Sequence, residues 1–358
     1  MRVSLLRDLP AEDRVSMEVF ADRLAAALRA QPAVSVTETT VRNGNRLVSR
    51  FLRYPLVARR VAADVHHVID QGYGDIAALL PLKRTLVTCH DLIALLGSDL
   101  RGAPRTSWVS AARFRWSVSF LRRVAHVVCD SESTRADVLE LLGVPEERVS
   151  VVHPGVSPHF RPLERAAVEH VRRRLAGDRP LVLHVSLGQP YKNVDGALRA
   201  VAGLHAAGIP AVLARTGRPL SPASQRLAWD LGLDGSLVEL GMVAVDRLVE
   251  LYSACDVFFF PSFYEGFGLP VLEAMACGAP VVASDCPALA ELIGEAGVLA
   301  PAYDVPALTQ ALARVLESPE LAQTLRARGV ERAKAYSWEQ AAQAYAEIYS
   351  AVASAAAA

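Results

Sequence analysis

The chain has 358 residues, of which 52% are hydrophobic and 21% are charged, and its formal net charge at pH 7 is zero. This composition excludes a disordered polypeptide, and the balanced charge argues against a nucleic-acid partner. No apolar run approaches the roughly 20 residues that a membrane-spanning helix needs. The length suits two domains of ordinary size.

In the first part of the chain, short apolar strands alternate with helical segments. Strands are expected at 2–6, 34–41, 64–70, 85–89, 125–129 and 149–153, and helices near 16–30, 46–62, 105–123 and 132–142. Strands that alternate with helices predict a parallel sheet with helices on both faces.

A proline-rich segment, HPGVSPHFRP at 153–162, then interrupts the alternation, and such a composition is typical of a linker. Beyond it the pattern restarts. Strands are expected at 181–185, 211–214, 236–240, 256–260, 279–283 and 297–300, with helices between them and three closing helices. The fold class is therefore α/β, with an N-terminal Rossmann-like domain at 1–160, a second one at 161–336, and a C-terminal helix at 337–358.

The cysteines and the N-terminal residues indicate the cellular compartment of the protein. The five cysteines show no C-x-x-C spacing and lie in or beside apolar stretches, which favours buried, reduced thiols. The first residues, MRVSLLRDLPAEDR, lack the apolar segment of a signal peptide. We therefore expect a cytoplasmic location.

The most informative stretch is FFFPSFYEGFGLPVLEAMACGAPVVA at 258–283. A buried strand ends at Pro261, a loop with two glycines follows, and a helix begins at Leu269. Pro270 fits the first turn of that helix, where a backbone N–H has no intrahelical acceptor. The free N–H groups and the positive dipole end of such a helix suit a phosphate. We expect the backbone of Gly266, Phe267, Gly268 and Leu269 to bind a diphosphate.

Two carboxylates frame this loop in an E-x7-E spacing, Glu265 and Glu273. A carboxylate pointing at a phosphate would repel it, so we expect both to accept hydrogen bonds from hydroxyl groups. Glu273 would hold the vicinal hydroxyls of a ribose, and Glu265 those of a sugar. The alternative is a plain tight turn at Gly266 and Gly268 with both glutamates in solvent.

The string Y-E-G-F-G-L-P-x-L-E-A-M-A-x-G-x-P-V-V resembles the donor-site signature of the retaining glycosyltransferases of family four. The match is dense over 238–300 and looser over 84–350. The resemblance implies the GT-B fold, in which two Rossmann-like domains face each other across a cleft and the C-terminal helix crosses back onto the first domain. It also implies front-face attack on the donor, with the leaving phosphate helping to deprotonate the acceptor.

Lys192 lies between the strand 181–185 and the next helix, at the carboxyl end of a strand where α/β folds bind ligands. As a point charge it would stabilise the diphosphate and the leaving group; the alternative is a surface lysine on a loop. The family usually has an arginine just before this lysine, and this chain has none. We expect Arg218 or Arg215 to replace it, or backbone N–H groups to suffice, and the backbone of Val243 to approach the base.

His90 ends the strand 85–89 and is followed by Asp91. The resemblance implies that His90 contacts the donor sugar. A general base and a structural histidine are the alternatives. The expected catalytic residues are therefore Glu265, Lys192 and His90.

The chain contains no D-x-D pair, the usual cation ligand of nucleotide-sugar enzymes of the other main architecture. We expect no metal and no cofactor, with a GDP- or UDP-linked sugar as co-substrate. Many family members also have a glycine-rich loop after the first strand. Residues 7–18 contain no glycine, so the acceptor geometry does not transfer to this chain.

Two tracts, 42–63 and 101–124, each contain six arginines and no acidic residue. They also carry aromatic residues, including Phe51 in the first tract, and Trp108 and Trp116 in the second. Such helices either lie on a membrane surface or are ordinary basic surface helices. On the first interpretation the protein is peripheral on the inner face of the cell membrane and its acceptor is lipid-linked.

The expected function is transfer of a hexose, with retention, from GDP-mannose or a UDP-sugar to a glycan or lipid-linked acceptor in surface polysaccharide or glycoconjugate synthesis. The G-F-G-L-P form resembles that of mannosyltransferases. Two alternatives remain: a nucleotide-sugar epimerase or isomerase of the same architecture, and a non-catalytic relative that binds nucleotide or glycan.

Overall fold

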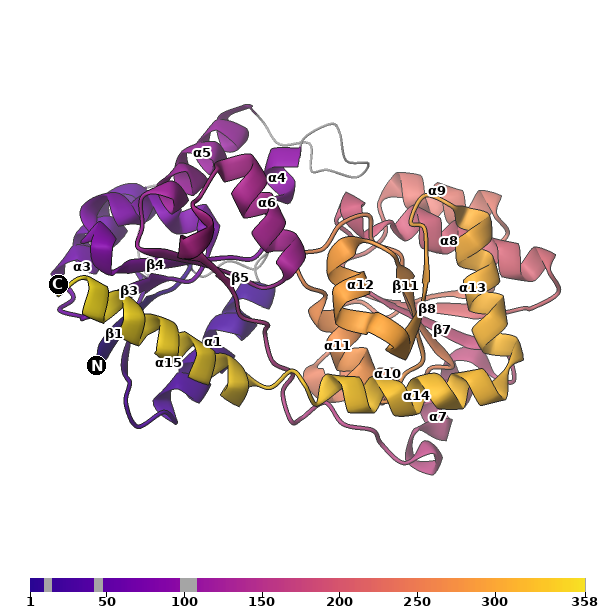
Figure 1. Ribbon diagram of the computed structural model, residues 1–358. Coiled ribbons are helices and arrows are strands. Elements are labelled where there is room, and N and C mark those ends of the chain that lie inside the picture. Colours follow the sequence, from indigo (N-terminus) through magenta and orange to yellow (C-terminus); the bar gives the residue numbers. More distant parts are fainter. Residues whose placement is uncertain (10–14, 42–47, 97–107, 358) are drawn as a thin grey trace. The chain divides into compact units, whose positions relative to one another are not determined.

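The structure is a computed structural model that describes residues 1–9, 15–41, 48–96 and 108–357 (Figure 1). The chain divides into two compact units. Unit 1 is built on Met1–Leu95, Arg105–Gly155 and Tyr336–Ala358, and unit 2 on Val156–Ala335. The change from unit 1 to unit 2 falls inside the proline-rich segment. Each unit contains a six-stranded sheet in which every pairing is parallel.

The sheet of unit 1 has the order β2-β1-β3-β4-β5-β6. Its strands are β1 (Arg2–Leu6), β2 (Ser35–Thr39), β3 (Val65–Val68), β4 (Thr85–Cys89), β5 (His126–Cys129) and β6 (Val149–Val151). The central strands are buried along their length because helices cover both faces.

The two faces of this sheet are covered by different helical elements. One face packs against α3 (Tyr54–Arg60), the 3-10 segment η2 (Gln71–Leu79), α5 (Trp108–Ser119) with η5 (Phe120–Arg122), and α6 (Glu132–Leu142). The other face packs against α1 (Val15–Arg29) and α15 (Trp338–Ala355). In Figure 1, α15 lies beside α1, so the last helix of the chain completes the core of the unit that begins it.

A buried polar network attaches α15 to the sheet. The two ring nitrogens of His67 contact the Tyr349 hydroxyl and Thr88 Oγ1, each at 2.7 Å. Thr88 also contacts the Tyr345 hydroxyl at 2.9 Å. Burial lowers the pKa of His67 to about 3, so this imidazole is neutral.

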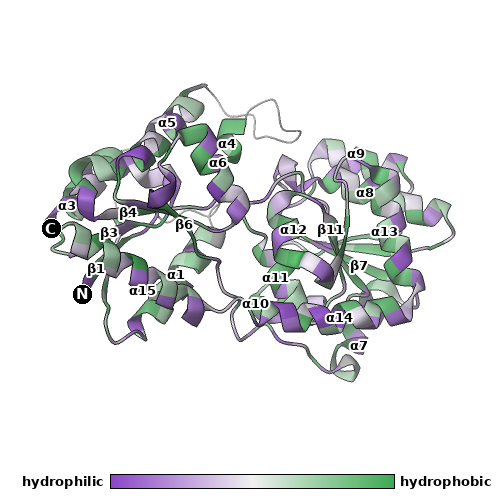
Figure 2. Ribbon diagram, in the orientation of Figure 1, coloured by the Kyte–Doolittle hydropathy of each residue, from purple (hydrophilic) through white to green (hydrophobic). Residues whose placement is uncertain are grey.

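The sheet of unit 2 has the order β12-β11-β10-β7-β8-β9. Its strands are β7 (Leu181–Val185), β8 (Val212–Thr216), β9 (Leu237–Glu239), β10 (Val257–Phe260), β11 (Val281–Ser284) and β12 (Gly297–Ala300). Its helices are α7 (Arg165–Ala176), α8 (Val194–Ala206), α9 (Pro222–Asp230), α10 (Val245–Ala254), α11 (Leu269–Ala276), α12 (Pro287–Ile293), α13 (Val305–Glu317) and α14 (Pro319–Ala333). Figure 2 shows hydrophobic residues along the strands, whereas α13 and α14 alternate between hydrophobic and hydrophilic residues.

Several expected elements differ from those observed. The helix expected over 46–62 is a π-helical turn, η1 (Ser49–Arg53), that continues into α3, and residues 42–47 lie outside the described residues. Of the helix expected over 105–123, residues 108–122 are described. The sequence reasoning missed η2 and α7. The remaining short helices are α4 (Ile93–Leu96), η3 (Leu82–Arg84), η6 (Glu146–Arg148), η7 (Pro190–Lys192) and η8 (Gly294–Ala296).

All five cysteines are buried and free, in agreement with their spacing. A search of the described ranges finds no helix with the length and apolar character required to cross a bilayer.

Candidate functional site

The strand order of unit 2 brings the ends of β7 and β10 together. The chain places β8 and β9 on one side of β7, then crosses back to place β10, β11 and β12 on the other side. β7 and β10 are neighbours where the order reverses, with Val182 opposite Val257. Open parallel sheets bind ligands outside the carboxyl ends of the strands at such a reversal. The segments that follow these two strands therefore form the candidate site.

Lys192 and Glu265 meet across this reversal, although they are 73 residues apart in the chain. Lys192 follows β7 and Glu265 follows β10, and Nζ lies 2.7 and 2.9 Å from the two carboxylate oxygens. The side chains are only 13% and 8% exposed. The ammonium also lies 5.0 Å from the ring centroids of Tyr191 and Phe260, so aromatic faces complete its surroundings. The sequence reasoning identified both residues but not their contact.

Asn193, which the sequence reasoning missed, fixes the position of Lys192. It has a left-handed backbone (φ +53°), and its side chain caps α8 by accepting from the Gly196 N–H. The side-chain amide donates to the carbonyls of Pro261 and Ala302, each at 3.0 Å. One side chain thus joins the loops after β7, β10 and β12. Its sequence signal was modest: asparagine tolerates the left-handed region and is a good N-cap.

The helix α11 begins as expected at the end of the glycine-bearing loop. Gly268 is its N-cap with φ +108°, and a Cβ at this position would lie 2.5 Å from Leu289 Cδ2. Only glycine fits both the backbone conformation and the space. Phe267 is buried, whereas Gly266 and Leu269 are half-buried. The first N–H groups of α11 therefore begin immediately beyond Glu265, at the same edge of the sheet.

Glu273 lies in the second turn of α11 and contacts α10. The Tyr252 hydroxyl donates to Glu273 Oε2 at 3.1 Å, which the sequence reasoning did not anticipate. Burial raises the pKa of Glu273 to about 7, and the tyrosine hydrogen bond opposes this shift in part. The carboxyl group therefore exchanges its proton near neutral pH.

The structure distinguishes the two arginines that were expected to replace the missing one. Arg215 is buried at the end of β8, where it pairs with Glu239 (2.9 Å) and donates to the Arg218 carbonyl. A Cβ at Gly188 would lie 3.0 Å from Arg215 Nη2, so this guanidinium lies against the loop that precedes Lys192. Arg218 is exposed, and Val243 is half-buried beyond β9.

His90, expected to contact the donor sugar or act as a base, has both ring nitrogens engaged inside unit 1. Nδ1 lies 2.7 Å from Asp130 Oδ2, and Nε2 lies 2.8 Å from the Ile69 carbonyl. A carbonyl and a carboxylate only accept, so both nitrogens donate and the ring is an imidazolium. Burial opposes the charge, but Asp130 outweighs it and raises the pKa of His90 to about 9. This geometry supports the structural alternative, because neither nitrogen is available to a ligand or a proton.

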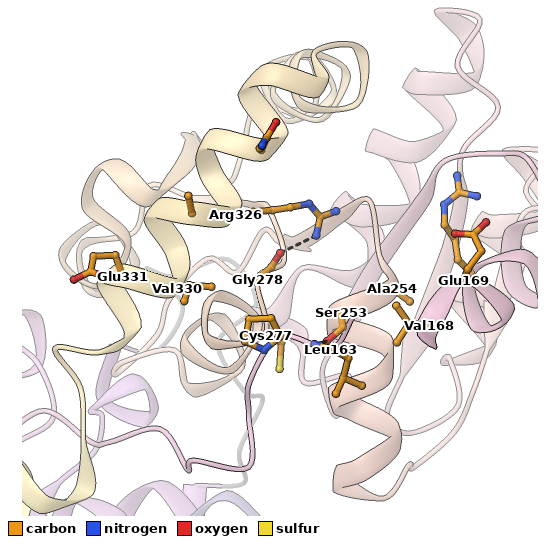
Figure 3. A pocket seen from close by; sticks show the side chains of 14 residues that line it. Leu163, Val168, Glu169, Ser253, Ala254, Cys277, Gly278, Arg326, Val330 and Glu331 are labelled. Carbon is orange, nitrogen blue, oxygen red and sulfur yellow. Dashed lines mark hydrogen bonds between the residues drawn. The ribbon is translucent and has the colours of Figure 1, made fainter. Parts of the chain in front are cut away.

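Two hollows lie away from these residues. A cavity of about 450 Å³ in unit 2 opens near the amino ends of β10 and β11, and its lining includes Leu163, Cys277 and Val330 (Figure 3). Arg326 borders it and donates to the Gly278 carbonyl at 2.7 Å. A second cavity, of about 510 Å³, lies in unit 1 beside the carboxyl end of β1, with Arg7 in its lining. The loop after β1 continues into residues 10–14, outside the described residues.

The site in unit 2 combines one cation, a helix N-terminus and two carboxylates at the edge where the strand order reverses. Such a set can bind an anion beside a group that bears hydroxyls. Within the residues described, no cluster of three or more His, Cys, Asp or Glu side chains is arranged to hold a metal ion.

Two family models match most of the chain between them. The model of glycosyl transferases group 1 matches residues 167–332, and that of glycosyltransferase family 4 matches residues 3–160. The first range includes every predicted site residue of unit 2, and the second includes His90.

Curated relatives are distant. The O-antigen chain mannosyltransferase B of Escherichia coli is 28% identical over 324 residues, which cover 85% of this chain and 82% of that protein. The serotype-specific mannosyltransferase WbdA of the same species is 29% identical over 79% of this chain but only 36% of its own length. The D-inositol 3-phosphate glycosyltransferase of Thermobispora bispora is 34% identical over 64% of this chain and 55% of its own. The chain thus spans about a third to a half of the last two proteins.

Solved structures share the fold at low identity. Sucrose-phosphate synthase from Thermosynechococcus elongatus matches with a TM-score of 0.82 and 22% identity over 99% of this chain and 100% of that one. Anabaena HepE in complex with UDP-glucose matches with a TM-score of 0.80 and 18% identity over 98% and 100% of the two chains. The glycosyltransferase WaaG matches with a TM-score of 0.73 and 16% identity over 98% and 99%.

Proposed function

We infer the function of this protein from its family: the chain belongs to glycosyltransferase family 4, and the model of glycosyl transferases group 1 matches its unit 2. It is a glycosyltransferase. We propose that it transfers a hexose from a nucleotide sugar, with retention of configuration, to a glycan or lipid-linked acceptor in surface polysaccharide or glycoconjugate synthesis.

The observation that carries this proposal is the Lys192–Glu265 pair where β7 and β10 meet, just before the N-terminus of α11. Each charged group of this pair neutralises the other, so neither is buried alone. On donor binding, Lys192 and the first N–H groups of α11 would bind the diphosphate. Glu265 would then accept hydrogen bonds from the sugar hydroxyls while its charge still orients the ammonium.

The ribose would bind at Glu273. Tyr252 donates to Oε2, and in the part of the chain that the structure describes no hydrogen bond to Oε1 is found, so this oxygen remains available for a hydroxyl. Burial disfavours the charged form of Glu273 and raises its pKa to about 7. Hydrogen bonds from the ribose hydroxyls would stabilise that charged form. We assign Val243 to the base side of the donor and Arg218 to the diphosphate side.

The chemical step would use the donor's own phosphate as the base. Glu265 is held by Lys192 on both oxygens, so it is a poor nucleophile for a covalent intermediate. Both nitrogens of His90 already donate. In front-face attack, the glycosidic C–O bond to the phosphate breaks as the acceptor oxygen bonds to the same face. The leaving phosphate takes the acceptor proton, and Lys192 stabilises the growing negative charge.

GDP-mannose and UDP-sugars are both proposed donors. The E. coli relatives are mannosyltransferases by name, which supports GDP-mannose, and HepE binds UDP-glucose, which supports a UDP-sugar. A thermal-shift panel of UDP, GDP, ADP and their hexose conjugates would distinguish the base and the sugar together, because at equal concentration a ligand of higher affinity stabilises the native state more.

The panel would be run on the wild type, on K192A and on K334A, since Lys334 is an exposed lysine of the same unit that pairs with Glu331. We expect one nucleotide sugar to stabilise the wild type and K334A, and K192A somewhat less, because the charge that Lys192 stabilises grows mainly in the transition state. Conversion of that donor without any acceptor would instead indicate an epimerase or isomerase. Binding with neither transfer nor hydrolysis would indicate a non-catalytic relative.

A further inference from the structure

Two aromatic rings stack at the carboxyl edge of the sheet of unit 2. Phe263 follows β10 and Tyr303 follows β12, and their ring centroids lie 4.7 Å apart with an angle of 18° between the ring planes. Phe263 is half-buried, whereas Tyr303 is 50% exposed although Phe263 covers one face of its ring. We call this pair the aromatic platform. It offers an aromatic surface to solvent at the edge where α/β folds bind their ligands.

The backbone fixes Phe263 beside the candidate donor site. Its N–H donates to the carbonyl of Tyr191, the residue before Lys192, at 2.8 Å. Glu265 follows Phe263 by two residues, a stretch of chain that spans at most about 7 Å. Phe263 is therefore tied to both members of the Lys192–Glu265 pair, to one by a hydrogen bond of its neighbour and to the other by the chain itself.

Asn193 fixes the two loops of the platform relative to each other. Its side-chain amide donates to the carbonyl of Pro261, two residues before Phe263, at 3.0 Å. The same amide donates to the carbonyl of Ala302, immediately before Tyr303, also at 3.0 Å. Both rings are thus held in place by the fold, and a rigid surface loses less conformational entropy when a ligand binds to it.

The surroundings of the platform carry carboxylates and no cation from the same stretch of chain. β11 lies between β10 and β12 in the sheet, and Asp285, which follows β11, is exposed. Asp304, directly after Tyr303, is exposed as well and caps α13 by accepting from the Ala307 N–H. The sequence contains no Lys or Arg from 248 to 313. An acidic edge of this kind disfavours phosphates and other anions, whereas sugar hydroxyls can donate to its carboxylates.

The strand order places the platform on the side of Glu265 that is away from the proposed base position. Val243 follows β9 at one border of the sheet, and the platform spans the ends of β10 to β12 at the other. A donor with its base near Val243 and its hexose at Glu265 would therefore leave the platform uncovered. A second ring on the platform would lie beyond the donor hexose, where the acceptor has to approach.

We propose that the aromatic platform stacks against a pyranose ring of an uncharged acceptor glycan. The C–H groups on one side of a pyranose ring form an apolar surface that suits the face of an aromatic ring, and its hydroxyls would donate to Asp285. The inference rests on the proposed function and deepens it, because it names the chemical class of the acceptor: a neutral sugar ring, with no phosphate or carboxylate on the ring that stacks.

The test measures binding of small sugars to the full-length protein by saturation-transfer NMR, without nucleotide sugar. The probes are methyl α-mannopyranoside, methyl β-glucopyranoside, mannobiose and cellobiose. Mannitol is the control for hydroxyls without a ring, and glucuronic acid is the control for a ring with a negative charge. We expect saturation to reach the ring C–H protons of at least one glycoside, with much weaker transfer to mannitol and to glucuronic acid.

Variants of the platform locate the binding. Y303L keeps an apolar side chain but removes the ring, and it should bind the glycoside about two- to tenfold more weakly, the range expected for an aromatic contact. Y303F keeps the ring and should bind like the wild type. D285A should bind about tenfold more weakly, the loss expected for one hydrogen bond to a charged group. Trp229, 71% exposed on α9, supplies the control W229A, which should bind like the wild type.

Four results would overturn the proposal. They are no saturation transfer to any glycoside, equal affinity of Y303L and the wild type, transfer to mannitol as strong as to the glycosides, and a loss in Y303L that affects the nucleotide sugar but no glycoside. The last would assign the platform to the donor hexose. Failure of the proposed function would appear differently, because no nucleotide sugar would then stabilise the protein whether or not glycosides bind.

Discussion

The His90–Asp130 pair of unit 1 and the Lys192–Glu265 pair of unit 2 both join side chains that follow neighbouring parallel strands. Both pairs have a 2.7 Å contact, and in both the side chains are nearly buried. They differ in their remaining hydrogen-bonding capacity. His90 uses both of its nitrogens on protein acceptors, whereas the Lys192 ammonium makes its two side-chain hydrogen bonds to one carboxylate beside a helix N-terminus.

Position at a strand end therefore does not by itself leave a charged side chain free to bind a ligand. Burial does not separate the two pairs either. What separates them is whether a ligand could share a partner: on the proposed function a diphosphate would bind Lys192 beside Glu265, whereas a ligand could reach His90 only by breaking two buried hydrogen bonds. Loss of function and loss of stability should therefore divide between the two pairs.

The largest effect is expected from K192A. Removing the cation that stabilises the leaving phosphate should lower kcat by about 10²–10³-fold, which is typical for loss of one preorganised electrostatic contact. KM for the donor should change less, because the charge on the phosphate grows mainly in the transition state. Steady-state transfer kinetics with K334A as control would measure this. Wild-type kcat in K192A would refute the role.

H90N should reduce stability and its dependence on pH. The pKa of His90 is about 9, above its ordinary value of 6.5. Its contribution is therefore complete below pH 6.5 and is lost as the pH rises to 9, and it amounts to about 3 kcal/mol. Urea unfolding at pH 6.5 and 9 should show this decline in the wild type and a flatter dependence in H90N. The exposed pair of His159 and Asp246 offers the control H159N.

If H90N instead kept its stability but lost kcat in the folded enzyme, the comparison between the two pairs would fail. The sugar-contact role implied by the family resemblance would then be the better account of His90.

E273Q should change how donor binding depends on pH. Glu273 has a pKa of about 7, and only its carboxylate accepts two hydroxyl donors, so binding to the wild type should tighten as the pH rises from 6 to 8. E273Q should bind about tenfold more weakly at pH 8, the loss expected for one charged hydrogen bond, and should show little pH dependence. Titration calorimetry at the two pH values would measure both.

The same substitution has an opposite effect on stability. A pKa raised above the ordinary 4.5 means that stability is lost as the pH rises from 4.5 to 7. At pH 8, E273Q should therefore be more stable than the wild type, by up to about 3 kcal/mol. A less stable E273Q would contradict the idea that this carboxylate is retained for binding.

The smallest effect is expected from Y349F. It removes the hydroxyl that contacts His67 and should lower the free energy of unfolding by about 1–2 kcal/mol, the cost of leaving a buried polar group unsatisfied. Since His67 is neutral, with a pKa of about 3, the loss should be the same at pH 6 and pH 9. A loss that varied with pH would show that this imidazole becomes charged.

Much of the fold could be predicted from local patterns. Buried parallel strands are short, continuous apolar runs, so strands such as 181–185 were found with the observed bounds. The 3-10 segment η2 was missed because its glycines and alternating small residues lack a helical period. The break at Ser49–Arg53 was missed because a π-helical turn shifts the phase of an otherwise helical pattern.

The candidate site was predictable in its members but not in its contacts. Glu265, Gly268 and Lys192 stand in segments whose types and spacing indicate a phosphate-binding edge. Tyr252 and Asn193 have no such signal, because a tyrosine in a helix and an asparagine before one are common. Their roles depend on which strands become neighbours.

By itself, the sequence determined two parallel α/β units, the glycine-bearing loop before α11 and the identity of the charged residues at strand ends. The spacing of apolar residues and the positions of glycines and charges are local properties, which can be read from neighbouring residues. The tertiary structure alone decided that Lys192 contacts Glu265, that Tyr252 donates a hydrogen bond to Glu273 and that His90 pairs with Asp130. Those outcomes depend on strand order, which brings together residues far apart in the chain and sets which polar groups remain to meet a ligand.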